Sequence, residues 1–419
     1  MKEVALGIDV GTSGVRIAAR ARDGALQAIS SAEMAAPLTE FGRALQDPTI
    51  WWDALTKAFA RLDLTGLQVL ALAVDGTSGT ILPIDDRDAA VGLASMYYDV
   101  ADAELIKRIA AVAPSDTAAL GSTSPLARAL AMPAGRIAHQ ADWLMGRLCG
   151  VFDVSDENNA LKSGYDPVKR QWPAWILKIG FDLSRFPKVV AAGVRVGTVL
   201  PAMAKQFKLP DGVAVVAGTT DGCAAFLASG AATAGDGVTS LGNTLTLKLL
   251  SATPVFAPQY GIYSHRIGDQ WLAGGASNSG GAALAAHFSS ADIVRLSAFI
   301  DPAVSTGLDY YPLAKPGERF PVNDVNFAPR VSPRPKDDTV FLQGLFEGVA
   351  AIERRGYAKL AELGASPLVS IRTVGGGAGN EKWSAIRLKA LSVPARAAES
   401  EHVAMGVARL AWRGIGHDA

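Results

Sequence analysis

The stretch Gly7-Ile8-Asp9-Val10-Gly11-Thr12-Ser13-Gly14-Val15-Arg16 decides how this 419-residue chain folds, because it joins two strand patterns through a tight turn. The apolar run Val4–Leu6 before it predicts a buried strand, and the alternating run Val15–Ala18 predicts a returning strand. Glycines let the backbone approach a ligand closely, and the hydroxyls of Thr12 and Ser13 add donors. The turn therefore suits phosphate oxygens, although an ordinary glycine-rich hairpin is the alternative from this stretch alone.

A carboxylate, Asp9, stands at the entrance of this turn. An ionised carboxylate only accepts hydrogen bonds, so its natural partner beside a phosphate is a hard cation such as Mg²⁺. No Gly-Lys-Ser/Thr follows, which excludes a Walker P-loop, and strand–turn–strand differs from the strand–turn–helix of a dinucleotide fold.

A second copy of the pattern occurs at Gly237–Lys248, where a turn of glycine and hydroxyl residues again separates two strand-like runs. The aligned turn residues are Gly11 with Gly242, Thr12 with Asn243, and Ser13 with Thr244. Two phosphate-type hairpins, one in each half of the chain, indicate an internal duplication. The leading interpretation is a nucleotide held between two similar lobes.

The composition is that of a globular protein with balanced charge. Lysine and arginine together number 40, as do aspartate and glutamate, so nothing attracts the chain generally to nucleic acid or an anionic membrane. The two cysteines, Cys149 and Cys223, favour a reducing compartment. Asp9 interrupts the apolar core that a signal peptide needs, and no run of about 18 apolar residues appears, so we expect a cytoplasmic protein without a membrane span.

Two further apolar runs predict buried strands with polar tips. Val69–Val74 ends in Asp75-Gly76-Thr77-Ser78, and Val213–Gly218 ends in Thr219-Thr220-Asp221. Ligands of open α/β sheets gather at the carboxyl ends of the strands. At a strand–helix junction, Asp221 could take the proton from an alcohol that attacks a phosphate, and capping the helix would not exclude that role.

Two glycine-rich segments in the second half of the chain predict nucleotide contacts. Gly280-Gly281 precede a helix, and glycines let such a helix start lie against phosphate. The strand Ile371–Val374 runs into three glycines, which would let an adenine ring lie flat on the backbone, with Asn380 as a hydrogen-bonding rim.

Together these segments resemble the FGGY carbohydrate kinases of the actin/hexokinase/Hsp70 superfamily, over essentially the whole chain. The matching motifs are the two hairpins, Gly218–Asp221, Met96–Asp99, and Gly375–Asn380 with Trp383 at the family's tryptophan position. The resemblance implies an α/β fold of two ribonuclease-H-like domains, each a mixed sheet flanked by helices, with ATP and sugar in an interdomain cleft. The sugar and phosphate domain would span residues 1–233, and the nucleotide domain residues 234–419.

The resemblance also implies an ATP-dependent sugar kinase and assigns its residues. Asp221 would be the catalytic base, and Asp9 would hold Mg²⁺ through water. The implied sugar ligands are Asp9, Gly76, Thr77, Ser78, Asp99 and Asp221. The implied ATP contacts are Gly11, Thr12, Ser13, Arg16, Gly242, Asn243, Thr244, Gly280, Gly281, Gly376, Gly377, Ala378 and Asn380.

The expected substrate is a ketopentose, with D-ribulose ahead of D-xylulose. Asp75-Gly76-Thr77-Ser78 replaces the Gln-Met-His type of xylulokinases, and the run Asn158–Asp166 looks like the ribulokinase branch. A site without an imidazole can accept a different orientation of the C3 hydroxyl. The chain departs from the family in its short length and in the threonines around Asp221. It also departs in Tyr98, which replaces an asparagine and would narrow the pocket.

Three classes of function compete at this point. The first is the sugar kinase, as a monomer or homodimer that binds sugar and ATP and no nucleic acid or membrane. The second is a nucleotide-gated module, actin-like or chaperone-like, against which the complete Asp221 segment counts. The third is a catalytically weak sensor of sugar and ATP, which only kinetics can separate from the first.

Overall fold

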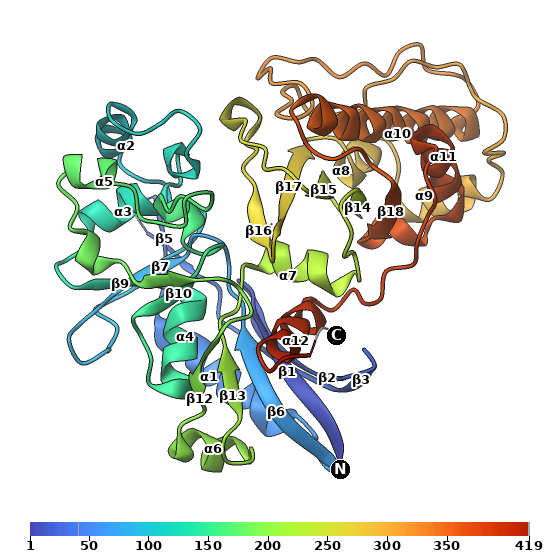
Figure 1. The fold of residues 1–419 in the computed structure, drawn as a ribbon. Helices are drawn as coiled ribbons and strands as arrows, with labels where there is room; N and C mark the ends of the chain where they lie inside the picture. The colour runs from blue at the N-terminus through green and yellow to red at the C-terminus, as the bar shows by residue number, and fades with distance from the viewer. Residues whose placement is uncertain (41, 418–419) are drawn as a thin grey trace. The chain divides into compact units, whose positions relative to one another are not determined.

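The computed structural model describes residues 1–40 and 42–417, which form two compact units (Figure 1). The first unit comprises Met1–Ala228, His265–Gly268 and the segment from His402, and the second comprises Ser229–Ser264 and Asp269–Glu401. The last helix therefore returns to the unit that contains the N-terminus. The predicted boundary between residues 233 and 234 stays a prediction.

The main sheet of the first unit has the strand order β12-β13-β6-β1-β2-β3. Its strands are β1 (Lys2–Val10), β2 (Gly14–Ala21), β3 (Leu26–Glu33), β6 (Leu67–Val74), β12 (Arg195–Thr198) and β13 (Ala214–Val216). The three central strands β13, β6 and β1 are parallel, and the outer pairings are antiparallel. Apolar side chains fill both faces of β1, which confirms the predicted buried strand.

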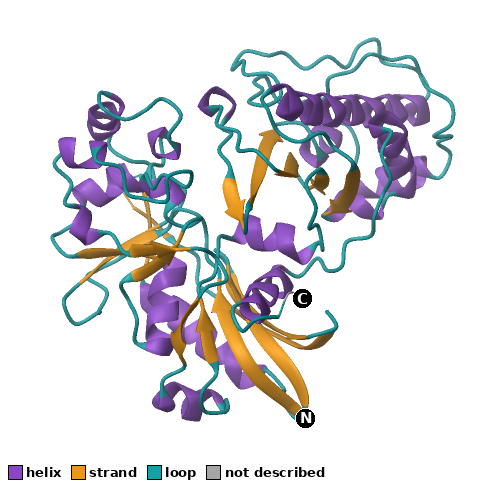
Figure 2. Cartoon of the chain, viewed as in Figure 1, coloured by secondary structure: helices purple, strands orange, loops and turns teal. Residues whose placement is uncertain are grey.

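Four helices accompany this sheet: α1 (Pro48–Arg61), α4 (Gln140–Cys149), α7 (Asp221–Ala228) and α12 (Val403–Arg413). Asp47 caps α1 by accepting from Thr49 N–H. Helix α12 packs directly on β1 (Figure 1 and Figure 2). The two backbones are so close that a Cβ on Gly7 would sit 1.9 Å from the Ala404 carbonyl oxygen. Only glycine permits so close an approach.

A second layer of the first unit contains a smaller sheet of order β4-β5-β8-β7-β9 and a two-stranded ladder. These strands are β4 (Leu38–Glu40), β5 (Arg43–Gln46), β7 (Ile81–Ile84), β8 (Ala94–Ser95), β9 (Arg136–His139), β10 (Val154–Asp156) and β11 (Lys188–Val190). The helices nearby in sequence are α2 (Ala103–Ala110), α3 (Pro125–Ala131), α5 (Trp175–Lys178) and α6 (Pro201–Phe207). Trp172 stacks on Phe186 at 4.3 Å in this core, so its role is packing.

The second unit repeats the hairpin in β14 (Asp236–Leu241) and β15 (Leu245–Ser251), with β17 (Gln270–Ser277) antiparallel to β15 and β18 (Ser370–Val374) parallel to β14. Strand β16 (His265–Ile267) falls in the first unit. The helices are α8 (Gly281–Ala285), α9 (Ser290–Ser297), α10 (Asp338–Glu362) and α11 (Glu381–Leu391). Helix α10 packs on α11 and on the sheet.

Both hairpins and the α/β architecture of mixed sheets with helices are as the sequence predicts. Each glycine-rich turn follows a strand that is paired in parallel on its other side, β1 with β6 and β14 with β18. None of the helices described is long and apolar enough to cross a membrane.

Candidate active site

Three carboxylates stand at the carboxyl ends of the three adjacent parallel strands of the first unit. Asp9 is the last residue but one of β1, Asp75 follows β6 directly, and Asp221 follows β13 after a short tip of four residues, 217–220. The tips are joined by backbone hydrogen bonds, Asp75 N to the Ile8 oxygen at 2.9 Å and Asp221 N to the Gly76 oxygen at 3.0 Å. The fold thus gathers at one sheet edge residues that are more than sixty positions apart in sequence.

Asp75 is the most deeply buried of these groups, with no exposed surface. Its Oδ1 accepts a hydrogen bond from Val10 N–H at 3.1 Å, whereas Oδ2 receives none from any N–H or hydroxyl in the described residues. Its carboxyl lies within hydrogen-bonding reach of that of Asp9. Burial, followed by the negative charges of Asp9 and Asp221, raises the pKa of Asp75 well above its usual range.

Asp9 is also buried, and one cation faces it. Arg16 Nη1 lies 3.5 Å from Asp9 Oδ2. Burial raises the pKa of Asp9 in spite of the opposing charge of Arg16, and the charge of Asp221 acts in the same direction as burial. Three like charges at one edge are electrostatically unfavourable, so the site favours a bound cation or proton.

Asp221 is the first residue of α7, where its Oδ1 accepts from Gly222 N–H at 2.7 Å. The tip before it is packed tightly, since a Cβ on Gly218 would lie 1.8 Å from the Val74 oxygen. The side chain is partly exposed, as a proton acceptor for a substrate must be. Its role as catalytic base stays a prediction.

A buried loop fixes the tip that carries Asp221, and sequence reasoning did not assign it this role. Asn158 Nδ2 donates to Thr219 Oγ1 at 2.9 Å, and Asn159 Nδ2 donates to the Thr219 oxygen at 3.2 Å. Asp156 holds both asparagines through their backbone N–H groups and the Asn159 side chain. Burial, with the nearby Asp142, raises the pKa of Asp156 to about 7.

The predicted sugar ligands Gly76, Thr77 and Ser78 follow directly on Asp75. Thr77 is buried, and its Oγ1 lies 2.9 Å from Gln140 Oε1 and 2.6 Å from the Thr80 hydroxyl. The Thr77 hydroxyl therefore already has partners within the protein. Ser78 Oγ, by contrast, has no partner among the described residues.

Asp99 is saturated by protein donors. Arg43 binds it in bidentate fashion, with Nε 2.9 Å from Oδ1 and Nη2 2.7 Å from Oδ2, and Ser95 Oγ and Ala44 N–H add hydrogen bonds. Burial would raise the pKa of Asp99, but these hydrogen bonds outweigh it and lower the pKa. This is the arrangement of a structural ion pair. Its predicted role as a sugar ligand stays a prediction, and the neighbouring Tyr98 is 40% exposed.

The turn of the first hairpin leaves room for a ligand. Gly11 N–H donates to the Gly14 oxygen at 3.1 Å, and a Cβ on Gly11 would meet nothing closer than 3.8 Å. Thr12 is partly exposed and Ser13 is exposed. Phosphate oxygens could therefore reach this turn.

In the second unit, the structure brings the second hairpin and the Gly280-Gly281 helix start together. Gly281 N–H donates to the Gly242 oxygen at 2.8 Å, and Ala282 N–H donates to the Asn243 oxygen at 3.0 Å. Gly280 has a φ of 126°, and a Cβ there would lie 2.9 Å from Leu245 N. Gly280 is buried against the hairpin, whereas Gly242, Asn243, Thr244 and Gly281 are at least partly exposed, and ATP binding by these residues stays a prediction.

The three-glycine segment forms a 3₁₀ turn, Gly376–Gly379, between β18 and α11. A Cβ on Gly376 would meet nothing within 4 Å, whereas one on Gly377 would lie 2.8 Å from the Leu241 Cβ. Asn380 caps α11 by accepting from Trp383 N–H, and its Nδ2 donates to Ser297 Oγ at 2.8 Å. Of these residues, Gly376 is the one open to a flat ligand, and adenine binding stays a prediction.

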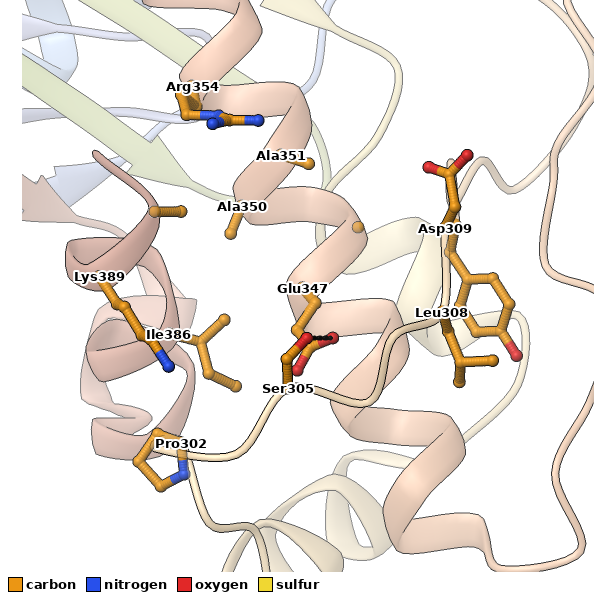
Figure 3. A pocket seen from close by; sticks show the side chains of 13 residues that line it. Pro302, Ser305, Leu308, Asp309, Glu347, Ala350, Ala351, Arg354, Ile386 and Lys389 are labelled. Carbon is orange, nitrogen blue, oxygen red and sulfur yellow. Dashed lines mark hydrogen bonds between the residues drawn. The ribbon is translucent and has the colours of Figure 1, made fainter. Parts of the chain in front are cut away.

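A cavity of about 330 Å³ lies elsewhere in the second unit, among α10, α11 and the loop that contains Pro302 and Leu308 (Figure 3). Lys389 Nζ donates to the Ala303 oxygen at its edge, and Glu347 accepts from Thr306. None of the predicted site residues lines this cavity.

Metal ligation by protein side chains alone is not supported. In the part of the chain that the structure describes, no group of three or more His, Cys, Asp or Glu side chains is arranged to hold a metal ion. Mg²⁺ commonly binds through one or two carboxylates together with water and substrate phosphates. Asp9 and Asp75 fit that pattern, since the two carboxyl groups lie close together and Oδ2 of Asp75 accepts no hydrogen bond from the described residues.

Known proteins resemble this chain in sequence and in fold. Residues 230–415 match the C-terminal domain of the FGGY family of carbohydrate kinases. The xylulose kinase of Escherichia coli strain K12 is 27% identical over 286 residues, which are 64% of this chain and only 58% of that enzyme. The chain thus matches little more than half the length of this relative.

Solved structures show the same fold. A structure named as a xyloylose kinase from Brucella ovis has a TM-score of 0.86 at 22% identity, covering 98% of this chain and 90% of that one. The xylulose kinase of Rhodospirillum rubrum has a TM-score of 0.85 at 22% identity, covering 99% and 90%. The family model thus matches the second part of the chain, and the solved structures share the fold of nearly the whole chain.

Proposed function

We propose that the chain is an ATP-dependent sugar kinase that transfers the γ-phosphoryl group of ATP to a hydroxyl of a ketopentose. The observation that carries the proposal is the placement of Asp9, Asp75 and Asp221 on three adjacent parallel strands, beside a turn open to phosphate. The FGGY domain and the similarity to a xylulose kinase support it.

Phosphoryl transfer asks mainly for positioning and charge neutralisation. Asp221 would accept the proton of the attacking sugar hydroxyl, because it is partly exposed and rigidly placed at the start of α7. Asn158 and Asn159 keep that group in place through Thr219. The turns at Gly11 and Gly242 would bind phosphate oxygens through backbone N–H groups, and Gly376 would lie against adenine.

The metal would be held by Asp9, through water, near the phosphates. Mg²⁺ supplies positive charge that offsets the negative charge of the phosphates in the transition state. Arg16, 3.5 Å from Asp9, orients that carboxylate and adds a second positive charge beside the turn.

For the substrate we propose D-ribulose ahead of D-xylulose. The support is the small hydroxyl-bearing segment Gly76–Ser78 in place of an imidazole, together with the loop Asn158–Asp166. Ser78 Oγ is buried and has no protein partner among the described residues, so a sugar hydroxyl would supply the hydrogen bond that it lacks. D-xylulose is the second candidate, because the E. coli relative is named a xylulose kinase.

The test is kcat/KM for D-ribulose, L-ribulose, D-xylulose, glycerol and L-fuculose under identical Mg·ATP. We expect D-ribulose to lead. A tenfold advantage of D-xylulose or glycerol, about 1.4 kcal/mol of transition-state preference, would reverse the substrate assignment and leave the kinase assignment intact. Failure of every sugar with ATP would refute the kinase assignment.

A further inference from the structure

We propose that Asp75 is a second carboxylate of the metal site, which holds the water shell of Mg²⁺ jointly with Asp9. The proposal rests on the proposed kinase function, because the remaining oxygen ligands would be water and nucleotide phosphates. It assigns a binding role to a residue that the sequence motifs left without one.

The first argument is topology. Strand β6 is the central one of the three parallel strands, with β1 on one side and β13 on the other. Neighbouring strands lie about 4.8 Å apart, so a carboxylate at the end of β6 stands between those at the ends of β1 and β13. Asp75 is therefore the middle member of the row Asp9, Asp75, Asp221.

The second argument is the hydrogen-bonding state of Asp75. Only Oδ1 has a donor, Val10 N–H, while the fully buried Oδ2 has none among the described residues. The carboxyl group of Asp75 also lies within hydrogen-bonding reach of that of Asp9. Two carboxyl groups in such contact need a proton or a cation between them. A bound Mg²⁺ with its waters would supply both the positive charge and the missing donors.

A structural cap alone does not account for this residue. Asp99 and Asp156, two other buried carboxylates of the first unit, have donors on both oxygens from protein groups. An amide or a hydroxyl would satisfy Val10 N–H without burying an acid next to Asp9 and Asp221. Burying this carboxyl group next to two other acids lowers the stability of the fold. A bound cation would offset that cost.

The experiment measures the affinity for ADP by calorimetry, in Mg²⁺ and in EDTA, for the wild type and Asp75→Asn. Asparagine keeps an oxygen for Val10 N–H and can donate to Asp9, so the fold should persist. We expect Mg²⁺ to strengthen ADP binding by the wild type, and Asp75→Asn to lose about tenfold or more of that gain while binding in EDTA stays unchanged. Mn²⁺ titrations followed by electron paramagnetic resonance should show the same loss.

Two further variants sharpen the result. Asp182→Asn removes an exposed carboxylate that caps a turn through Ser184 N–H, and it should keep the full metal dependence. Asp75→Ser removes the acid with a smaller side chain, in case the amide disturbs folding. A folded Asp75 variant that keeps the wild-type metal dependence overturns the inference, even when sugar turnover is normal. If the wild type binds Mg·ADP but phosphorylates no sugar, the proposed reaction fails and the inference stands.

Discussion

The two hairpins of this chain share a backbone and differ in charge. In the first, β1 lies between β2 and β6, and in the second, β14 lies between β15 and β18 with the same directions. When the turns are aligned, Ser240 stands where the first hairpin has Asp9, and Val374 stands where the neighbouring strand has Asp75. The two hairpins therefore share their strand pairing, and at these two positions only the first copy carries acids.

In the second copy, a buried ion pair joins helices α10 and α11, and its two charges neutralise each other. Glu353 and Arg387 form a bidentate ion pair with both N–O distances at 2.6 Å, fully shielded from solvent. Thr239 of β14 donates to Glu353, and Arg387 reaches Thr373 of β18. This network joins two strands to two helices and leaves no charge for a ligand, in contrast to the row of acids in the first copy.

The largest effect should come from the first copy. We expect Asp221→Asn to lower kcat by roughly 10²–10⁴-fold, the usual weight of a general base, with sugar and ATP affinities nearly unchanged. The matched measurement is steady-state kinetics beside calorimetric binding of each substrate. Near-normal turnover would remove Asp221 from the mechanism.

Breaking the neutral network of the second copy should affect stability. Glu353→Gln leaves Arg387 as an uncompensated buried charge, for which we expect a loss of about 3–5 kcal/mol in the free energy of unfolding. Urea denaturation measures it. The double variant Glu353→Leu with Arg387→Met should recover much of the loss, and an unstable double variant would contradict the view that the pair only fills and satisfies the core.

The sequence predicts which acids could form the first site, but it predicts less of the strand order and hydrogen bonds that position them. Asp9 and Asp221 are predictable because each follows an apolar strand within a recognisable motif. The role of Asp75 depends on β6 lying between β1 and β13, and strand order is not contained in local pattern. Likewise, the donors that saturate Asp99 come mostly from residues 43 and 44, more than fifty positions away, so that no local signal reveals them.

Exchanging the residues that distinguish the hairpins tests the comparison directly. Asp9→Ser gives the first copy the residue of the second, and we expect it to weaken the use of Mg²⁺ by about 10–100-fold, seen as a higher Mg²⁺ concentration for half-maximal rate. Ser240→Asp puts an acid beside the second turn and should weaken ATP binding by repelling the phosphates. An unchanged Mg²⁺ titration in Asp9→Ser would remove Asp9 from the metal site.

A smaller effect, on the pH dependence of the free energy of unfolding, should distinguish the two units. Burial raises the pKa of Asp156 to about 7 in the first unit, whereas hydrogen bonds from Ser370 and backbone N–H groups outweigh burial and hold that of Asp236 at about 2 in the second. The native state therefore binds the Asp156 proton more tightly than the unfolded chain does. Its contribution to stability is present below about pH 4 and is lost as the pH rises to about 7.

The difference in unfolding free energy between the wild type and Asp156→Asn should fall by at most about 1.4 kcal/mol per pH unit over that window, then level off. Urea titrations at pH 5, 6, 7 and 8 measure it. Asp236→Asn serves as the matched variant, because its contribution changes only as the pH falls from about 4 toward 2. A difference that stays flat from pH 5 to 7 for Asp156→Asn would contradict the raised pKa.

The mildest test concerns the glycine turn that follows β18 in the second copy. Gly376→Ala adds a methyl group into open space, so stability should be unchanged, and any rise in the KM for ATP would report contact with the nucleotide. We expect a rise of about fivefold, corresponding to about 1 kcal/mol of overpacking against adenine. Gly377→Ala is the contrasting variant, because its methyl would press on Leu241 and Trp383 and should lower the melting temperature.

Sugar affinity should be unaffected in Gly376→Ala, since the sugar ligands that we propose lie in the first unit. If the KM for ATP stays at its wild-type value while the fold is intact, adenine does not lie on Gly376, and the second copy binds the nucleotide through its hairpin and the Gly280-Gly281 helix start instead.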